Sequence, residues 1–440
     1  MSGRGPAGGG RGPAARGRGG LLRRHRDFRL LWCGETAGKF GASVTSVSMP
    51  LVAVAILHAG PFAVGLLTAA SWAPWLLIGL PVGAWVDRLP RRPVMLIAAA
   101  VSLVLFAAVP LAARAGWLTI QLLLVVALLT GAAAVFFQTA YTAYLPTLLA
   151  PDDRAEGNSK LQGSASAAQI AGLGTGGLIA QLAGAVNGMY VNATTFLVSL
   201  LCLRRIRHRE PRATARTART TSLAGEVADG LRLVAHDPWL RPLTLFGAAS
   251  NLALMGYQSI QVVFLVRGVG VDPGGVGGLV AATSVGGVAG AFLARRAADG
   301  IGTARALLLF ELGFAVPALL MPLAFGGVGL VLFVAGGFCV TAGVVAGNVV
   351  ASGFRQRYCP PELRGRLAAS AAFLAYGTIP LGALLGGTLG SVLGPRAALA
   401  VTTAGVPLAA LILYFSPIGR TRDLPLSRPR AEGEPAPARA

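Results

Sequence analysis

Three ionisable side chains lie inside long apolar stretches of this sequence, where a charge is costly. Glu35 and Lys39 are four residues apart in the stretch 30–57, and Glu311 stands alone in the stretch 304–324. A charge in the hydrocarbon region of a membrane costs about 2.5–3.5 kcal/mol on insertion scales, so each of these residues needs a partner or a purpose. The four-residue spacing places Glu35 and Lys39 on one helical face, where they can neutralise each other.

Two interpretations of these charges stay open at this point. In the first, Glu35 exchanges a proton with the cytoplasm, and Lys39 tunes its acidity or meets an anionic group of a substrate. In the second, the two residues form an ion pair that only fixes the rotation of their helix. Glu311 is either a further proton carrier or, because it lies near a predicted helix start, an end residue at the membrane interface.

Neutral polar and aromatic side chains in the apolar stretches predict a central cavity. Gln162 and Gln169 are seven residues apart and share a helical face. Trp72 and Trp75 could stack on an aromatic ligand, although membrane tryptophans more often pack or anchor. The predicted cavity residues are Trp72, Trp75, Gln138, Tyr141, Gln162, Gln169, Asn192, Asn251, Tyr257, Gln258 and Asn348.

Other chemistry has little support in the sequence. The four cysteines lie far apart and no histidine stands at metal-ligand spacing, so we expect no metal site and no cofactor. Neither an HExxH nor a GxSxG motif is present, which argues against an intramembrane enzyme. There is also no GxxxxGK[ST] loop for ATP, so any transport must draw on a gradient.

The composition identifies the elements that must position these residues. Hydrophobic residues make up 54% of the chain, charged residues 12%, and the mean hydropathy is +0.65, although the formal net charge is +21. Sixty glycines and 27 prolines suit closely packed membrane helices. Because a spanning helix needs roughly 20 apolar residues, the sequence predicts an all-α membrane protein with twelve spans. They cover about 30–57, 62–82, 93–113, 118–148, 159–183, 187–206, 241–266, 274–296, 304–324, 328–354, 363–390 and 396–416.

The basic residues predict the orientation of these spans. Thirty-four Lys and Arg residues fall in the two tails and in alternate gaps, and only Arg114, Arg267 and Arg396 fall in the other gaps. Lys and Arg are retained on the cytoplasmic side, so both termini are expected to be cytoplasmic. Nucleic-acid binding is not expected, because the basic residues sit between apolar spans and not on one soluble face.

The longest interruption divides the twelve spans six and six. Within it, Leu223, Val227, Leu231 and Val234 fall on one helical face, which predicts an amphipathic surface helix; a plain tether is the alternative. The predicted organisation is a disordered Arg-rich tail (1–29), a six-helix bundle (30–206), a cytoplasmic linker (207–240), a second six-helix bundle (241–416) and a disordered tail (417–440).

One loop carries a specific motif. It reads Gly83-Ala-Trp-Val-Asp87-Arg88-Leu-Pro-Arg91-Arg92 and lies between the second and third spans on the predicted cytoplasmic side. Gly83 would permit close approach of a neighbouring helix, and the arginines would hold the loop at the anionic inner leaflet of the bilayer. This loop resembles the signature loop of the major facilitator superfamily.

The resemblance implies two pseudo-symmetric six-helix bundles that bind a small molecule by alternating access. It implies that Asp87 and Arg88 lock the bundles together on the cytoplasmic side in the outward-open state. The chain is most similar to a bacterial branch with enterobactin-type siderophore exporters and macrolide efflux proteins. Segments that carry this similarity include Phe62-Ala-Val-Gly-Leu-Leu-Thr and Glu156-Gly-Asn-Ser-Lys-Leu. A monomer in the inner membrane of a bacterium is the implied state.

The sequence departs from the branch in two respects. Leu173 replaces the proline of a Gly-Pro motif in span five, so the glycines around it could simply pack helices. Gln138 and Asn192 stand where acids are common, and Ala165 and Ala372 stand where arginines are common, which favours a neutral or weakly polar substrate. We therefore expect export of a drug, antibiotic, siderophore or other secondary metabolite by proton antiport. The alternatives are an importer, or a sensor or scaffold that no longer transports.

Overall fold

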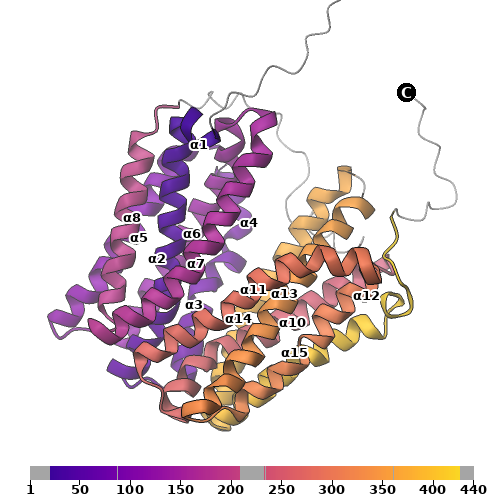
Figure 1. Cartoon of the computed structure of the whole chain (residues 1–440). Helices are drawn as coiled ribbons and strands as arrows, with labels where there is room; N and C mark the ends of the chain where they lie inside the picture. The colour runs from indigo at the N-terminus through magenta and orange to yellow at the C-terminus, as the bar shows by residue number, and fades with distance from the viewer. Residues whose placement is uncertain (1–19, 87, 209–231, 233, 360, 427–440) are drawn as a thin grey trace, which may run out of the picture.

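A computed structural model describes residues 20–86, 88–208, 232, 234–359 and 361–426 of the chain. All secondary structure within these residues is helical. Figure 1 shows two groups of helices, indigo to magenta and rose to yellow, which approach each other at one end and diverge toward the end where α1 lies. The arrangement agrees with the all-α membrane fold that the sequence predicts.

The first group contains the helices before residue 206. In chain order they are α1 (Leu21–Arg24), α2 (Arg26–Leu51) with its π-helical continuation η1 (Val52–Ile56), α3 (Pro61–Leu77), α4 (Gly79–Val86), α5 (Arg91–Arg114), α6 (Ile120–Leu148), the 3-10 turn η2 (Pro151–Asp153), α7 (Arg154–Leu182) and α8 (Asn187–Arg205). Helix α2 packs against α7 and α8, and α6 packs against α3 and α5.

The second group begins at residue 240. It contains α10 (Leu240–Val263) with the π-helical turn η3 (Phe264–Val269), α11 (Pro273–Ile301), α12 (Thr303–Leu308), η4 (Leu309–Gly313), η5 (Val316–Leu323), η6 (Gly327–Gly329), α13 (Leu330–Tyr358), α14 (Pro361–Val392), α15 (Pro395–Tyr414) and η7 (Pro417–Arg420). Helix α10 packs against α14 and α15, and α11 packs against α13.

Eight helical stretches of the described chain are long and apolar enough to cross a membrane. They are Arg26–Ile56, Arg91–Arg114, Ile120–Leu148, Leu240–Val269, Pro273–Ile301, Thr303–Leu323, Gly327–Tyr358 and Pro395–Tyr414. The other four predicted spans coincide with α3 plus α4, α7, α8 and α14. For these four, the crossing of the membrane stays a prediction.

Prolines interrupt two of the predicted spans. The second span is divided at Ile78, because Pro81 has no N–H to donate to the carbonyl of Leu77. The ninth span changes from α12 to the π-helical turn η4 and then to the 3-10 segment η5, which contains Pro317 and Pro322. Each of these spans is therefore a broken helix, and the predicted span 304–324 is still found as one apolar stretch, Thr303–Leu323.

Parts of both predicted disordered tails are ordered in the structure. Residues 21–29 are helical in large part, and Leu21 and Phe28 are buried, so this part of the predicted tail 1–29 was wrong. At the other end, η7 and the residues to 426 pack on the second group, with Ile418 and Leu424 buried. Apolar side chains within these basic segments provide the contacts. Residues 1–19 and 427–440 lie outside the described residues.

The predicted linker is described only at its two ends, because residues 209–231 and 233 lie outside the described residues; the linker and its amphipathic helix stay predictions. Asp237 fixes the start of α10: its Oδ1 accepts hydrogen bonds from the N–H groups of Trp239 and Leu240, both at 3.0 Å. Its Oδ2 accepts a hydrogen bond from the hydroxyl of Tyr358, at 3.0 Å. The buried carboxylate therefore ties the entry to α10 to the end of α13.

Glycines bring the two groups together at their converging end. Helix α7 contacts α11 where Gly177 meets Gly277, and α3 contacts α14 where Gly65 meets Gly387. In α7, Gly172 and Gly176 also lie against the backbone of α2, and the helix is unbroken. The glycines around Leu173 therefore pack helices.

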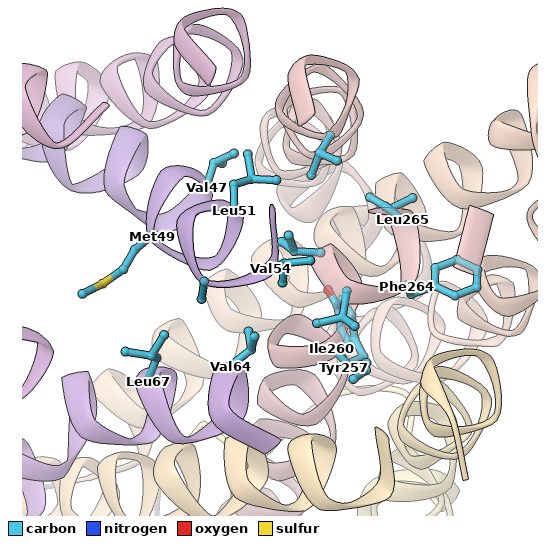
Figure 2. Packing of buried hydrophobic residues seen from close by; sticks show 14 of the residues in the cluster. Val47, Met49, Leu51, Val54, Val64, Leu67, Tyr257, Ile260, Phe264 and Leu265 are labelled. Carbon is cyan, nitrogen blue, oxygen red and sulfur yellow. The ribbon is translucent and has the colours of Figure 1, made fainter. Parts of the chain in front are cut away.

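A large hydrophobic cluster lies at the same end. Figure 2 shows Leu51 and Val54 near the end of α2 gathered with Ile260 and Leu265 from α10 and η3. All four side chains are at most 2% exposed. Because this cluster joins both groups, it closes the space between them at one end.

Candidate functional site

A cavity of about 940 Å³ lies between the two groups of helices. The first group contributes residues of α2, α3, α5, α6, α7 and α8, and the second contributes residues of α10, α11 and α13. Its size is within the range of small-molecule sites, which hold drug-sized ligands in about 300–1,000 Å³. The cavity therefore has the position and size of a binding site shared by both groups.

Most of the predicted site residues line this cavity. Those that do are Glu35, Lys39, Trp72, Trp75, Gln138, Gln162, Gln169, Asn192, Tyr257 and Gln258. Tyr141, Asn251, Asn348 and Glu311 are not part of its lining. Tyr141 is buried and its ring stacks on that of Phe137, with centroids 6.4 Å apart.

Glu35 and Lys39 form the ion pair that their spacing predicts. The Lys39 Nζ lies 3.4 Å from the Glu35 Oε1, and both side chains line the cavity. The Glu35 side chain is 10% exposed and the Lys39 side chain 45%. No other charged residue of the described chain lines the cavity. The site therefore carries one paired charge of each sign and is otherwise neutral.

Asn192 is engaged in helix packing. Its Nδ2 donates to the Thr45 hydroxyl at 2.6 Å, and its Oδ1 accepts from the Thr195 hydroxyl at 3.2 Å. The residue is 1% exposed, and Gly41 of α2 lies so close that a Cβ there would overlap with it. Asn192 thus joins α8 to α2 at the cavity wall. Gln162 and Gln169 are exposed to the cavity, as is Gln258.

Three aromatic rings form a cluster where α3 meets α14. The Trp75 and Tyr376 ring centroids are 4.6 Å apart, and the Trp72 ring lies 6.2 Å from each of the other two. Trp72 and Trp75 also line the cavity. The cluster therefore presents indole surface at a contact between the two groups. Tyr376 was not predicted from the sequence, because no pattern within α14 indicates which ring it meets on α3.

Hydroxyl side chains make up a further part of the lining that was not predicted from the sequence. Thr45, Ser71, Thr130, Ser166, Thr283 and Thr341 belong to it. Several bond to their own helix; the Thr130 hydroxyl donates to the Val126 carbonyl at 2.7 Å. Serine and threonine are common on membrane helices, so their presence alone does not indicate a cavity. The sequence signal would have been hydroxyl residues on the same helical face as the glutamines of α7.

Glu311 occupies a separate, buried position. It lies in the π-helical turn η4, is 8% exposed, and packs against Gly347 of α13. A side chain at Gly347 would collide with the Glu311 carboxyl group. Glu311 is therefore accommodated at a glycine of α13, a burial that the sequence did not predict, and both interpretations of Glu311 stay predictions.

The signature loop is described in part. Asp87 lies outside the described residues. Arg92 donates from Nε to the Leu203 carbonyl at 3.0 Å and from Nη2 to the Arg204 carbonyl at 2.7 Å, so it binds the end of α8. Arg88 is exposed and Arg91 half-buried. Gly83 was expected to let a neighbouring helix approach closely. Among the described residues, no atom lies within 4 Å of the position that a Cβ at Gly83 would take, so this close helix contact is not seen.

Two groups of helices around a shared cavity are the arrangement expected of a membrane carrier. The sequence model of the Major Facilitator Superfamily matches residues 31–268, and the chain belongs to this family. Family membership indicates a transporter and not an enzyme. The resemblance of the 83–92 loop pointed to the same family.

Relatives and solved structures agree with this assignment. The chain is 29% identical to the multidrug efflux pump Tap of Mycolicibacterium fortuitum over 413 residues, which are 90% of this chain and 96% of the relative. It is 28% identical to the multidrug efflux pump Tap of Mycobacterium tuberculosis over 370 residues, 82% and 86% of the two chains.

The fold also matches solved transporters. The nucleoside transporter NupG has a TM-score of 0.70 at 12% identity, covering 88% of this chain and 98% of its own. A bacterial homologue of the iron transporter ferroportin in an inward-facing state has a TM-score of 0.71 at 18% identity, covering 90% and 98%. These likenesses concern the fold.

Proposed function

We propose that this chain exports small, neutral or weakly polar organic molecules in exchange for protons. The observation that carries the proposal is the cavity of about 940 Å³ whose charged lining, among the described residues, is the Glu35–Lys39 pair. A cavity with no net charge and many hydroxyl and amide groups favours ligands that hydrogen-bond without carrying a full charge. Drugs, antibiotics, siderophores and other secondary metabolites include such molecules.

The direction of transport is supported by the relatives. Those described above are named multidrug efflux pumps, and the alignment with Tap of M. fortuitum covers nearly the whole of both chains. Export from the cytoplasm is therefore the favoured direction for this chain.

Proton coupling is proposed for Glu35 because its carboxylate is the acid that lines the cavity. With Glu35 ionised, the pair with Lys39 has no net charge and a substrate can occupy the cavity. A proton on Glu35 removes its attraction for Lys39, and the ammonium group is left beside the cavity without its partner. Substrate and proton would then compete for the carrier, which is the requirement for antiport. Glu311 is a second proton-carrying candidate, remote from the cavity lining.

Alternating access would follow from the arrangement of the two groups. The groups are joined at the end where the Gly177–Gly277 contact lies and diverge at the end that holds α1 (Figure 1). With the basic loops and both termini on the cytoplasmic side of a bacterial cell membrane, this arrangement is inward-open. Asp87 and Arg88 would hold the diverging ends together in the outward-open state. We propose that a monomer carries out the cycle.

Everted membrane vesicles test the proposal. With respiration acidifying the interior, vesicles that contain the protein should accumulate a neutral fluorescent drug, and nigericin, which removes the pH gradient, should release it. Vesicles from the same cells without the protein are the control. Loss of accumulated drug in place of uptake would indicate an importer. No difference from control vesicles across a broad panel of drugs, antibiotics and siderophores would favour a sensor or scaffold and contradict the proposal.

A further inference from the structure

The six turns on the predicted outer side of the membrane are short and mostly apolar. They join η1 to α3, α5 to α6, α7 to α8, η3 to α11, η5 to α13 and α14 to α15, with two to six residues in each, and all of them are described. At or beside five of these turns stand large apolar side chains that are 43% to 86% exposed. This outer rim consists of Ile56, Phe62, Trp117, Leu182, Phe325, Val328, Val392 and Leu393.

Few charges accompany the outer rim. The charged residues near the six turns are Arg114, Arg267, Asp272 and Arg396. The Arg114 guanidinium lies 5.2 Å from the ring centroid of Tyr190, and Arg396 donates to the Ala324 carbonyl at 3.0 Å, so both side chains lie against the protein. Arg267 and Asp272, which are exposed, flank the sixth turn, the one without a rim side chain.

An exposed apolar rim of this kind is unfavourable in water. Apolar surface in water costs about 25 cal/mol per Å² relative to an apolar environment. Exposed apolar side chains along the spans are covered by the hydrocarbon core of the membrane, but the rim lies at the ends of the spans. Its depth along the membrane normal therefore decides whether water, lipid or another protein covers it.

Helix α15 indicates this depth at one point of the rim. It has 20 residues and is about 30 Å long at 1.5 Å per residue, which equals the thickness of the hydrocarbon core. Only Leu393 and Gly394 separate it from Val392 at the end of α14. The headgroup layer is about 5–7 Å thick on each side, and a two-residue turn is too short to leave it.

The other outer turns reach little further. The longest, residues 324–329, leads outward with about three residues and back with three, which limits its height to about 10 Å when fully extended. Half of it is the 3-10 turn η6, which is more compact. A protein partner in the water phase would need a rim that projects beyond the headgroups, and these turn lengths do not provide one.

We propose that the outer rim lies in the headgroup layer of the outer leaflet and contacts lipid there. The amphipathic ring of Trp117 suits this layer, where tryptophan is enriched in membrane proteins. Resting on the transport cycle proposed above, the outward opening of the carrier then lies beside lipid at five of its six turns. The seating of the rim itself does not depend on substrate or on proton coupling.

Nitroxide labels on the full chain in phosphatidylcholine vesicles test the depth of the rim. The labels are attached to Val328→Cys, Val392→Cys and Leu182→Cys, one at a time, on a chain whose native cysteines are replaced. Molecular oxygen concentrates in lipid, and a water-soluble nickel chelate stays outside it. The control is Asp152→Cys, an exposed residue in the turn between α6 and α7 on the predicted inner side.

The ratio of oxygen collisions to nickel collisions should be several-fold higher at the three rim positions than at Asp152. An equal ratio at all four positions would place the rim in water and overturn the proposal. Low collision rates with both reagents at the rim would also overturn it, because another protein or a second copy of the chain would then cover the rim. The measurement needs no substrate, so its failure and the failure of drug export in vesicles are separate results.

Discussion

In the proposed transport cycle, the Gly177–Gly277 contact would make the balance between inward-open and outward-open states sensitive to a single methyl group. An alanine at 177 would place its Cβ 2.6 Å from the Gly277 Cα and 2.7 Å from the Gly274 carbonyl oxygen, whereas ordinary contacts begin near 3.4 Å. Both of these atoms belong to the backbone of α11 and cannot rotate away. The overlap can be relieved only if α7 and α11, which belong to different groups, move apart by nearly 1 Å.

Such overpacking costs about 1–3 kcal/mol. The cost falls on the state in which the two helices touch and not on the state in which they separate, so Gly177→Ala should shift the equilibrium toward the outward-open state by about 5–150-fold. Gly174→Ala is the matched control. It lies one turn earlier on the same helix, and its Cβ would stand 3.7 Å from the Ala281 Cβ, an ordinary contact.

Spin labels at Trp117 and Val328 measure this shift as a distance distribution. Trp117 lies between α5 and α6 and Val328 lies in η6, so each group carries one label, and the two residues are 77% and 86% exposed. On a chain whose native cysteines are replaced, Gly177→Ala should enrich the longer distance, and Gly174→Ala should match the parent. A folded Gly177→Ala chain with the parent distribution would refute the reasoning, because the two helices would then not be in contact.

Further predictions concern stability and substrate choice. Gly347→Ala should lower the free energy of unfolding by about 1–3 kcal/mol, because its methyl group meets the buried carboxyl of Glu311. Gly353→Ala is the control on the same helix, with its nearest neighbour at 3.9 Å. In a thermal unfolding assay the control should leave stability unchanged. Arg92→Ala should cost about 1 kcal/mol through its two bonds to the end of α8, and an unchanged melting temperature would contradict this. Trp75→Ala should reduce vesicle transport of planar aromatic drugs by several-fold more than that of aliphatic ones; an equal loss for both would argue against stacking.

Features that one helix determines could be predicted from the sequence. The Glu35–Lys39 pair and the shared face of Gln162 and Gln169 follow from helical periodicity alone, and both are present in the cavity. Tyr141 shows the limit, because it shares α6 with Gln138 but is buried and lies outside the cavity lining.

What depends on two helices could not be predicted. The meeting of Tyr376 with Trp75 requires the rotation of α14 relative to α3, which hydropathy does not encode. The burial of Glu311 could not be predicted for a similar reason: it depends on the glycine opposite it on α13 and on the π-helical turn in which it lies. The helix breaks at Ile78 and in η5 depend on local prolines and on packing against other helices. An apolar run in the sequence therefore does not give the positions of these breaks.

The role of Glu35 is the most direct test of the proposed transport cycle. The assay uses proteoliposomes with an imposed pH gradient. Glu35→Gln keeps the size of the side chain but removes the proton-binding group. The control Gln138→Asn changes an uncharged side chain in the same cavity. We expect substrate-driven proton movement and the pH dependence of transport to be lost in Glu35→Gln and retained in Gln138→Asn. Substrate-driven proton movement in Glu35→Gln with the wild-type pH profile would contradict the proposed cycle.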